Sequence, residues 1–505
     1  MSGIHLNIDP TDFFYWYYTE PMTKEAVLSY VNQYEGTQVD TILFCLSSMK
    51  AAYPSKKHER LWDGFDRNGG REQSFFDGLG DLYADAKEGM YKMYMTFALL
   101  EEEGIDPYEL WMKRCRQIGI SPWISFRMND VHCVDEPRHP FHTTMWREHP
   151  EYKRLPYRFT DWTDRAFDFG RPEVREYRLS MVEEMCELYD FDGFELDWMR
   201  FGYHFRPGFE EEGTAILTEL TRKVRAILDR AEVRRGHPIA LSARVPSRPA
   251  TSLYLGMDAW SWAKERLIDL LVVTPFWASV ENDMPIETWK QLLEGTGVTL
   301  AAGLEILLRP YREYRLDGEI PNNTPETTRG SAMSFLQRGA DVIYLFNYMD
   351  SQVAYFGPKL GLEGYRTLLS ETGDISTIRG KPRRHIVTFS DVNAVGALQM
   401  DLLPRELSSD DYVSFRVPIG ERPCSEQIAR VVLSLSENEG SNPADYAVRV
   451  NGIPCESDED YRPVDPCPEN CKCWKIPGSA LHDGTSVVEL TGMNGVAHWL
   501  EIAVD

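Results

Sequence analysis

The stretch 190-DFDGFELDWMRF-201 decides how the rest of the chain can fold. Within it, apolar side chains alternate with Glu195 and Asp197, which is the two-residue period of a β-strand. If the apolar side chains face helices, both carboxylates point into the space that the sheet encloses. Burying two like charges is unfavourable unless neighbouring groups compensate for them, so this strand predicts an enclosed polar site.

Seven further strand-like runs share this character, and amphipathic segments of helix length separate them. The eight expected strands are residues 3–9, 40–48, 121–129, 191–199, 238–246, 268–276, 298–306 and 341–349. The expected helices are residues 22–34, 107–117, 172–189, 214–233, 257–267, 286–295, 326–339 and 359–371. This alternation is typical of a (β/α)8 TIM barrel. A doubly wound open sheet is the alternative, but no glycine-rich phosphate loop follows the first strand.

Beyond residue 371 the helical pattern gives way to short alternating strands. They are expected at residues 384–391, 395–402, 412–418, 428–435, 446–452, 485–492 and 498–504, which predicts an all-β sandwich. We therefore expect a catalytic barrel domain at 1–373 and a β-sandwich domain at 374–505. The second domain is expected to pack against the barrel or against a neighbouring subunit of a homo-oligomer, although it could also bind carbohydrate.

The bulk composition excludes several classes of partner. A net charge of -25 argues against nucleic acid and anionic membranes, because both require basic patches. The longest apolar runs are too short to span a bilayer, and no secretory signal is visible, so we expect a cytoplasmic protein. Cys467, Cys471 and Cys473 cluster without the paired spacing of a zinc site, and we expect no metal and no cofactor.

The two-residue period assigns an inward face to each barrel strand, and polar residues gather on it. They are His5, Asn7, Asp9, Ser125, Arg127, Asn129, Glu195, Asp197, Ser242, Arg244, Thr274, Glu305 and Asn347. Branched apolar side chains normally fill a barrel interior, so polar residues from several strands indicate an active site. Two long connections, residues 48–106 and 130–170, follow strand ends and are expected to wall it.

Asp197 and Glu305 are the predicted catalytic pair, since each ends its strand. Two carboxylates suit glycoside hydrolysis, in which one protonates the leaving oxygen and the other attacks or activates water. We assign Asp197 as acid/base and Glu305 as nucleophile or base, and keep the reverse assignment open. The small residues Ala301 and Gly303 are expected to leave space below Glu305. The alternative for Asp197 is a buried ion pair with an arginine.

Substrate contacts are expected from Asn7, Asp9, Arg127, Asn129, Glu195, Arg200, Arg244, Trp277 and Asn347. The arginines, with Arg309, indicate an anionic substrate unless they simply neutralise Asp197 and Glu195. Glu195 is interpreted as a supporting group. Aromatic residues expected at the loop mouths, where they would suit sugar stacking, are Phe14, Tyr15, Trp16, Trp162, Trp277 and Tyr348. His132 and His204 are either acid/base helpers or ordinary loop histidines.

Residues 167–201 resemble the middle of the family-10-like glycosyl hydrolases, a set of bacterial TIM-barrel proteins. SSMKAAYPSK (47–56) and GMDAWSWAKERLIDLLVVTPFW (256–277) carry the same resemblance. It implies a glycosidase barrel with an acidic residue at the end of strand four, here Asp197. The strand also resembles the chitinase signature, although Met199 stands where the catalytic glutamate would be. In the large retaining-glycosidase clan the two catalytic carboxylates follow strands four and seven.

The sequence thus predicts a glycoside hydrolase that cleaves a small glycoside or an oligosaccharide. One rival is a metal-dependent barrel lyase or isomerase with Glu195, Asp197 and Glu305 as oxygen ligands. The other rival is a carbohydrate-binding barrel without catalytic activity.

Overall fold

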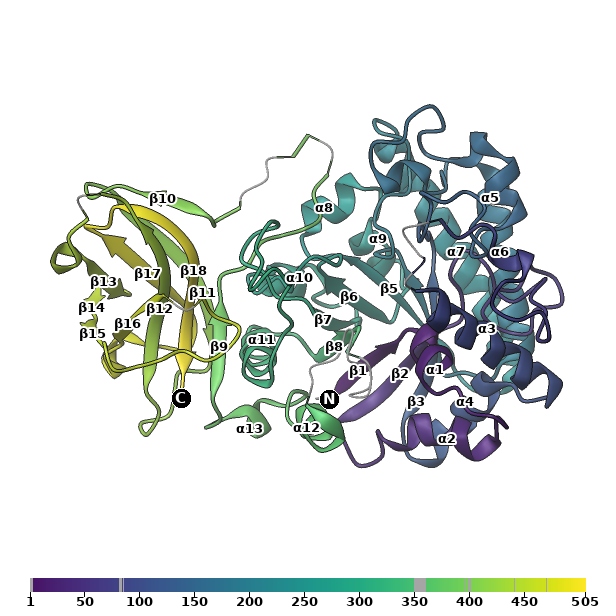
Figure 1. Ribbon diagram of the computed structural model, residues 1–505, viewed down its shortest axis with the longest axis horizontal. Coiled ribbons are helices and arrows are strands. Elements are labelled where there is room, and N and C mark those ends of the chain that lie inside the picture. Colours follow the sequence, from purple (N-terminus) through teal and green to yellow (C-terminus); the bar gives the residue numbers. More distant parts are fainter. Residues whose placement is uncertain are drawn as a thin grey trace. The chain divides into compact units, whose positions relative to one another are not determined.

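The computed structural model describes residues 3–80, 84, 86–348, 360–394, 396–397, 401–439, 441–468 and 470–505. Eight strands close into a parallel barrel in chain order (Figure 1). They are β1 (Ile4–Ile8), β2 (Val39–Cys45), β3 (Ser121–Arg127), β4 (Gly193–Asp197), β5 (Ala240–Pro246), β6 (Leu270–Thr274), β7 (Thr299–Glu305) and β8 (Val342–Phe346). Each overlaps its predicted range, so the TIM-barrel prediction is confirmed. Residue 349, the last of the expected eighth strand, lies outside the described residues.

Helices follow the strands as the pattern predicts. They are α1 (Pro10–Trp16), α2 (Lys24–Asn32), α3 (Lys87–Glu102), α4 (Pro107–Gln117), α5 (Thr144–Glu148), α6 (Pro172–Leu188), α7 (Glu210–Arg235), α8 (Pro249–Tyr254), α9 (Ala259–Lys264), α10 (Ile286–Leu292), α11 (Pro325–Gln337), α12 (Gly361–Leu369) and α13 (Ile375–Ile378). The sequence pattern did not predict α3. This helix buries consecutive residues from Met93 to Phe97, so its apolar side chains show no clear helical period.

The inward faces of β3, β4 and β5 form two polar layers. Residues paired across neighbouring strands share one face of a sheet, so the register defines each layer. Ser125, Glu195 and Ser242 make the lower layer, and Arg127, Asp197 and Arg244 make the upper one. Asn7 on β1 contacts Glu195 on β4, and these strands are not neighbours. Such a contact crosses the lumen, so these side chains point into the barrel.

The internal contacts of the chain divide it into two compact units. The first comprises His5–Val272 and Leu293–Thr299, and the second comprises Met1–Ile4, Val273–Leu292 and Leu300–Asp505. Strands β2 to β5 belong to the first unit, whereas β7 from Leu300 onward, β8 and the whole C-terminal region belong to the second. The predicted domain boundary at residue 373 falls between α12 and α13.

The C-terminal region consists of two antiparallel sheets. Its strands are β9 (Arg383–Ile386), β10 (Arg405–Leu407), β11 (Tyr412–Gly420), β12 (Ala429–Glu437), β13 (Ala447–Val450), β14 (Ile453–Pro454), β15 (Glu456–Ser457), β16 (Cys471–Lys475), β17 (Gly484–Thr491) and β18 (Gly495–Val504). One sheet has the order β10-β18-β12-β16-β15 with β9 beside β18, and the other has the order β11-β17-β13-β14. An apolar core that includes Phe415, Leu433, Val488 and Leu500 joins them as a sandwich.

Two details of the sandwich differ from the prediction or lie beyond the structure. Strand β16 was not predicted because it runs through the cysteine cluster, where proline and cysteine interrupt the strand pattern. It pairs with β12 along its whole length. The strand expected at 395–402 includes residues 395 and 398–400, which lie outside the described residues.

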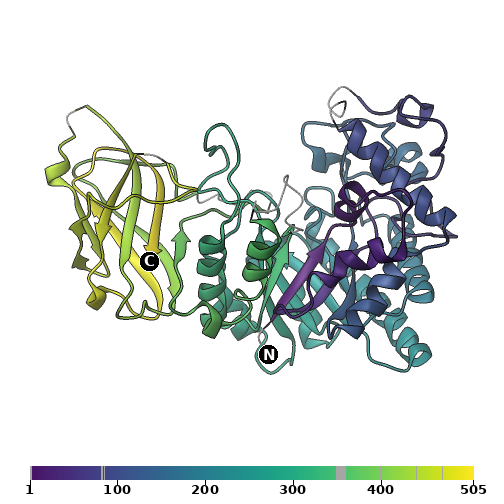
Figure 2. The ribbon, with the colours of Figure 1, turned by 60° about the horizontal axis from the view of Figure 1, so that its bottom comes forward.

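Helix α11 packs against strands of the C-terminal sandwich, and all of these elements belong to the second unit. Figures 1 and 2 both place α11 beside β9, and it also packs against β11. The approach is backbone to backbone, because a Cβ atom on Gly330 would lie 1.9 Å from the Arg384 carbonyl oxygen. Thr324 caps the helix through reciprocal hydrogen bonds with Thr327. The predicted packing of the C-terminal region on a barrel helix is therefore observed within this unit.

No helix among the described residues combines the length and the apolar character that a membrane span requires.

Candidate active site

The lower polar layer surrounds Glu195, which is completely buried on β4. Its Oε1 atom accepts hydrogen bonds from Ser125 Oγ at 2.8 Å and Asn7 Nδ2 at 3.4 Å. Both donors are neutral side chains from other barrel strands. They compensate part of the cost of burying this carboxylate and fix its position below Asp197.

In the upper layer, Asp197 forms a close ion pair with Arg244. Arg244 Nη1 lies 3.1 Å from Asp197 Oδ1 and 3.3 Å from Oδ2, and both side chains are buried. The backbone N–H of Met199 donates to Oδ1 at 3.0 Å. The ion pair that the sequence offered as an alternative for Asp197 is thus present, with Arg244 as the partner. A carboxylate held by a guanidinium suits the role of nucleophile or base better than that of proton donor.

A second set of charges runs from β1 to the loop after β3. Arg127 forms an ion pair with Asp9 and lies 3.7 Å from Asp130. Asp130 in turn holds His132, whose Nδ1 is 3.0 Å from both carboxylate oxygens, and His132 Nε2 lies 3.1 Å from Arg200 Nη2. Although burial alone would raise it, His132 and Arg127 hold the pKa of Asp130 well below its usual range. Asp130 was not among the predicted site residues, although its D-x-H spacing with His132 after β3 was an available signal.

Two of the predicted polar residues brace loops. Asn129 donates to the carbonyl oxygens of Phe167 and Tyr203 and accepts from the N–H of Phe167, so both of its amide hydrogens are used by the backbone. His204 is buried, and its Nε2 donates to the Trp198 carbonyl at 2.9 Å. Burial lowers the pKa of His204 to about 3, so it stays uncharged at neutral pH. Of the two interpretations offered for His204, the structure supports the ordinary loop histidine.

Glu305 ends β7 and has a different environment. Its Oε1 accepts from Asn347 Nδ2 at 3.1 Å and from the N–H of Ile306 at 3.1 Å. Asn347 has a φ of 60°, a left-handed conformation that asparagine tolerates better than most residues. The space expected below Glu305 is filled, because a Cβ on Gly303 would lie 2.4 Å from Thr274 Oγ1.

A polar network behind Glu305 holds its backbone. Asn323 donates to the Glu305 carbonyl oxygen at 2.7 Å and accepts from Thr327 Oγ1 at 2.9 Å. Tyr348 is buried, with its hydroxyl 3.2 Å from Thr328 Oγ1, so it does not line an open mouth as predicted. Burial, together with the nearby Glu305, raises the pKa of Tyr348.

The loop after β6 carries Trp277, which is half-buried. Asp391, from the segment after β9, accepts the N–H groups of Phe276, Trp277 and Ala278 at 2.8, 2.7 and 2.6 Å. Arg309 donates to the Ala278 carbonyl at 2.7 Å and is also buried, so its guanidinium braces this loop. Asp391 lies more than a hundred residues beyond the loop, and no sequence pattern connects the two.

The aromatic residues after β1 divide into core and surface. Phe14 is completely buried and stacks on Phe97 of α3, so the prediction that it lies at the mouth is wrong. Tyr15 is half-buried and donates to the Ala86 carbonyl, whereas Trp16 is half exposed.

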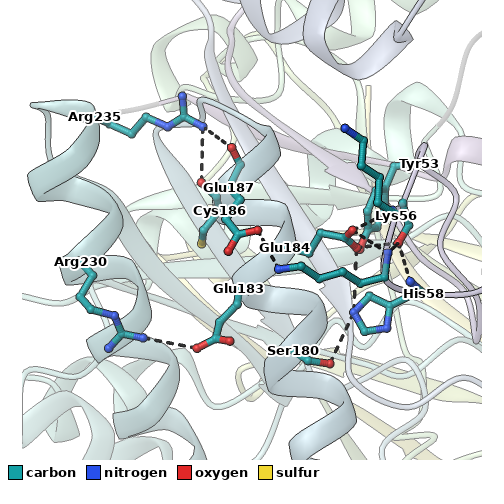
Figure 3. Close-up of polar contacts among 12 residues, drawn as sticks. Tyr53, Lys56, His58, Ser180, Glu183, Glu184, Cys186, Glu187, Arg230 and Arg235 are labelled. Atoms are coloured by element: carbon teal, nitrogen blue, oxygen red, sulfur yellow. Dashed lines mark hydrogen bonds and ion pairs between the residues drawn. The ribbon is translucent and has the colours of Figure 1, made fainter.

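A buried carboxylate on α6 anchors the loop after β2 (Figure 3). Glu184 accepts from Ser55 Oγ at 2.6 Å, Tyr53 Oη at 3.0 Å and the N–H groups of Lys56 and Lys57 at 2.8 and 3.0 Å. Burial favours the protonated form, but these hydrogen bonds outweigh it and lower the pKa of Glu184. These contacts attach residues 53–57 of the loop to α6.

The potential metal ligands of the chain include the cysteine cluster of the sandwich. In the part of the chain that the structure describes, no three His, Cys, Asp or Glu side chains are arranged to hold a metal ion. Cys471 and Cys473 lie on β16, and the Sγ atoms of Cys467 and Cys471 are 3.0 Å apart.

Comparison with known proteins gives distant similarities. No protein-family model matches the chain. No curated protein matches its sequence either. Among solved structures, the PgaB glycoside hydrolase domain from Bordetella bronchiseptica has a TM-score of 0.42 at 10% identity, over 73% of this chain and 99% of that domain.

Two further structures are similar at the same level. Alpha-L-fucosidase isoenzyme 2 from Paenibacillus thiaminolyticus has a TM-score of 0.41 at 14% identity, over 73% of this chain and 48% of the fucosidase. Trehalose-6-phosphate hydrolase from Bacillus licheniformis has a TM-score of 0.39 at 11% identity, over 97% and 99% of the two chains. Such values assign no family, and the resemblance to family-10-like glycosyl hydrolases stays a prediction.

Proposed function

We propose that this protein is a glycoside hydrolase in which Asp197 acts as nucleophile or general base and Glu305 acts as the proton donor. The observation that carries the assignment is the difference between their partners. Asp197 lies against the Arg244 guanidinium, whereas Glu305 receives a hydrogen bond from the neutral amide of Asn347. The assignment reverses the roles that we first gave the pair and adopts the variant that the sequence left open.

The chemistry requires both groups at one end of the barrel. Asp197 and Glu305 are the last residues of β4 and β7, and active sites of such barrels are built at the carboxyl ends of the strands. Glu305 would transfer its proton to the glycosidic oxygen as the bond to the anomeric carbon breaks. The Asp197 carboxylate would either bond to that carbon or take a proton from the attacking water.

The surrounding charges support binding and positioning of the sugar. Arg244 would hold the Asp197 carboxylate in one orientation, and Glu195 below it would be fixed by Ser125 and Asn7. Arg127, Asp9, Asn347 and Trp277 remain proposed substrate contacts, as does Arg200. We propose a glycoside or oligosaccharide as the substrate and infer no cofactor.

A hydrolysis screen tests the proposal. Wild type, Asp197→Asn and Glu305→Gln would be assayed on a panel of aryl glycosides that includes uronides, with EDTA as a separate arm. We expect at least one glycoside to be cleaved by wild type, without sensitivity to EDTA. Asp197→Asn should reduce its turnover by orders of magnitude, and Glu305→Gln should do the same on glycosides whose leaving group requires a proton. Absence of turnover across the panel, or turnover that survives both substitutions, would contradict the proposal. Turnover that EDTA abolishes would favour the metal-dependent rival.

A further inference from the structure

Residues 156–162, PYRFTDW, form a continuous exposed stretch between β3 and α6. Three aromatic rings lie in it, with exposed fractions of 82% for Tyr157, 43% for Phe159 and 39% for Trp162. Exposed apolar surface concentrated in one place generally marks a binding site. The one aliphatic residue next to the stretch, Leu155, is buried. The large apolar side chains that this stretch exposes are therefore all aromatic.

The loop is firmly held from below by Asp164. This buried carboxylate accepts from Arg158 Nη2 at 2.8 Å and Nε at 3.0 Å, and from the N–H groups of Thr160 and Asp161 at 3.1 and 3.2 Å. Although burial favours the protonated form, these contacts lower the pKa of Asp164 to about 2. Trp162 begins a short 3-10 helix that Asp161 caps. The rings are thus presented on a defined backbone.

Further anchors tie the same loop to the barrel. Arg154, which is buried, donates to the carbonyl oxygens of Thr163 and Phe205 at 2.8 and 2.6 Å. Trp146 donates from Nε1 to the Arg165 carbonyl at 2.8 Å. These contacts pre-organise the loop backbone that carries the exposed rings, which lowers the cost of binding a ligand. The Arg165 guanidinium lies 4.4 Å from the centroid of the Phe159 ring.

The loop is continuous with the proposed site at the end of β4. The Trp162 ring packs edge-on against Phe201 with centroids 4.8 Å apart, and Phe201 lies four residues after Asp197. On its other side Phe201 contacts the His132 ring at 5.4 Å, and His132 contacts Arg200. All of these residues belong to the first compact unit.

We propose that Tyr157, Phe159 and Trp162 form a stacking platform for the sugar units of an oligosaccharide or polysaccharide chain. Flat rings with polar groups between them, here Arg158 and Asp161, match a sugar, which offers C–H groups on its faces and hydroxyls at its rim. The assignment of the platform to the substrate of the same barrel rests on the proposed function. It narrows that function to glycan chains.

Affinity electrophoresis tests the platform without requiring turnover. The full-length Asp197→Asn protein would migrate through native gels that contain hydroxyethyl cellulose, xylan, polygalacturonate, glycol chitin or dextran. We expect at least one polysaccharide to retard it. Tyr157→Ala and Trp162→Ala should each weaken that retardation about fivefold to tenfold, since aromatic stacking contributes roughly a factor of this size.

Matched variants separate binding from folding. Tyr412→Ala removes a tyrosine that is 61% exposed on β11 of the sandwich, and it should leave the retardation unchanged. Trp162→Phe keeps a ring against Phe201 and should retain most of the binding. Retardation by none of the five polysaccharides, or retardation that Tyr157→Ala and Trp162→Ala leave intact, would overturn the proposal. Retardation that depends on these rings while the aryl glycosides remain uncleaved would support the platform and contradict the proposed hydrolase.

Discussion

Two buried carboxylates end barrel strands in this protein, and their surroundings differ. Asp197 on β4 lies within 3.1 Å of the Arg244 guanidinium and accepts a backbone hydrogen bond. Glu305 on β7 accepts from the Asn347 amide and from the N–H of the next residue. Asp197 is paired with a full positive charge, and the two donors described for Glu305 are neutral amide groups.

Different partners can give two carboxylates of one barrel different chemical roles. A neighbouring cation stabilises the ionised form of a carboxyl group, whereas neutral donors stabilise it less. Acid/base and nucleophilic roles require two carboxyl groups in different environments. In this account the partner of each carboxylate, more than its strand position, determines its role.

The largest effect is expected from removing the carboxylate of Asp197. Asp197→Ala should reduce kcat on a cleaved aryl glycoside about ten-thousand-fold, because it removes the carboxylate that attacks the anomeric carbon or activates the water. Sodium azide should restore part of the turnover, since a small anion fits the space that the side chain vacates. An Asp197→Ala variant within tenfold of wild-type kcat would remove Asp197 from the reaction.

The next effect is on stability and concerns the cation. Arg244→Met should lower the free energy of unfolding by about 3–5 kcal/mol, because it leaves Asp197 buried without its partner. The double variant Arg244→Met, Asp197→Leu should recover most of that loss. Urea unfolding followed by circular dichroism measures both.

Arg222→Met is the matched control for this prediction. Arg222 pairs with Glu265 on the surface, with side chains 44% and 41% exposed, and such pairs contribute less than about 1 kcal/mol. An equal loss of stability in Arg244→Met and Arg222→Met would mean that the buried ion pair of Asp197 contributes no more to the free energy of unfolding than the exposed pair does.

A smaller effect is expected at Asn347. Asn347→Gly keeps the left-handed backbone accessible but removes the donor to Glu305, and it should lower kcat about tenfold to a hundredfold. Asp317 has a φ of 53° on an exposed turn, so Asp317→Gly is a control for the backbone change alone. If the two variants retain the same kcat, the Asn347 amide does not position Glu305 for catalysis.

The smallest effect on activity is expected at Glu184, a buried carboxylate outside the lumen. Glu184→Gln should lower the free energy of unfolding by about 1–3 kcal/mol, because it disrupts four hydrogen bonds to the loop after β2, and it should leave kcat unchanged. Glu187→Gln on the same helix removes an exposed partner of Lys57 and is the control.

The effect of Glu184 should also depend on pH. The pKa of Glu184 in the folded protein lies below its ordinary value of 4.5, so its contribution to stability is complete above that pH. The contribution is lost as the pH falls through the lowered folded pKa. Urea unfolding at a series of acidic pH values should show the difference between wild type and Glu184→Gln shrinking. A constant difference at all pH values would contradict this explanation.

The sequence predicted the barrel and the faces of its strands because both depend on local periodicity. The alternation along β4 was enough to predict that Glu195 and Asp197 face the lumen. It could not choose which arginine would pair with Asp197, since Arg127 and Arg244 occupy equivalent register positions on its two sides. Partner choice depends on side-chain conformation, which the periodicity does not encode.

Local sequence patterns could not predict other features of the structure. Asp391 and Glu184 hold loops from distant parts of the chain, and neither stands in a motif that signals this role. Gly303 was interpreted as free space, but a neighbouring strand supplies Thr274 to fill it. Trp162 was predicted to lie at a loop mouth and to suit sugar stacking, and the structure adds that Tyr157 and Phe159 are exposed in the same loop.

The most direct test of the assignment is the dependence of Glu305→Gln on the leaving group. The kcat of wild type, Glu305→Gln and Asp197→Asn would be measured on a dinitrophenyl glycoside, which departs without a proton, and on an alkyl glycoside of the same sugar, which requires one. We predict that Glu305→Gln loses about a hundredfold to ten-thousand-fold on the alkyl glycoside but less than about tenfold on the dinitrophenyl glycoside. Asp197→Asn should lose activity on both. The opposite pattern, with Asp197→Asn rescued by the better leaving group and Glu305→Gln inactive on both, would contradict the roles assigned from Arg244 and Asn347.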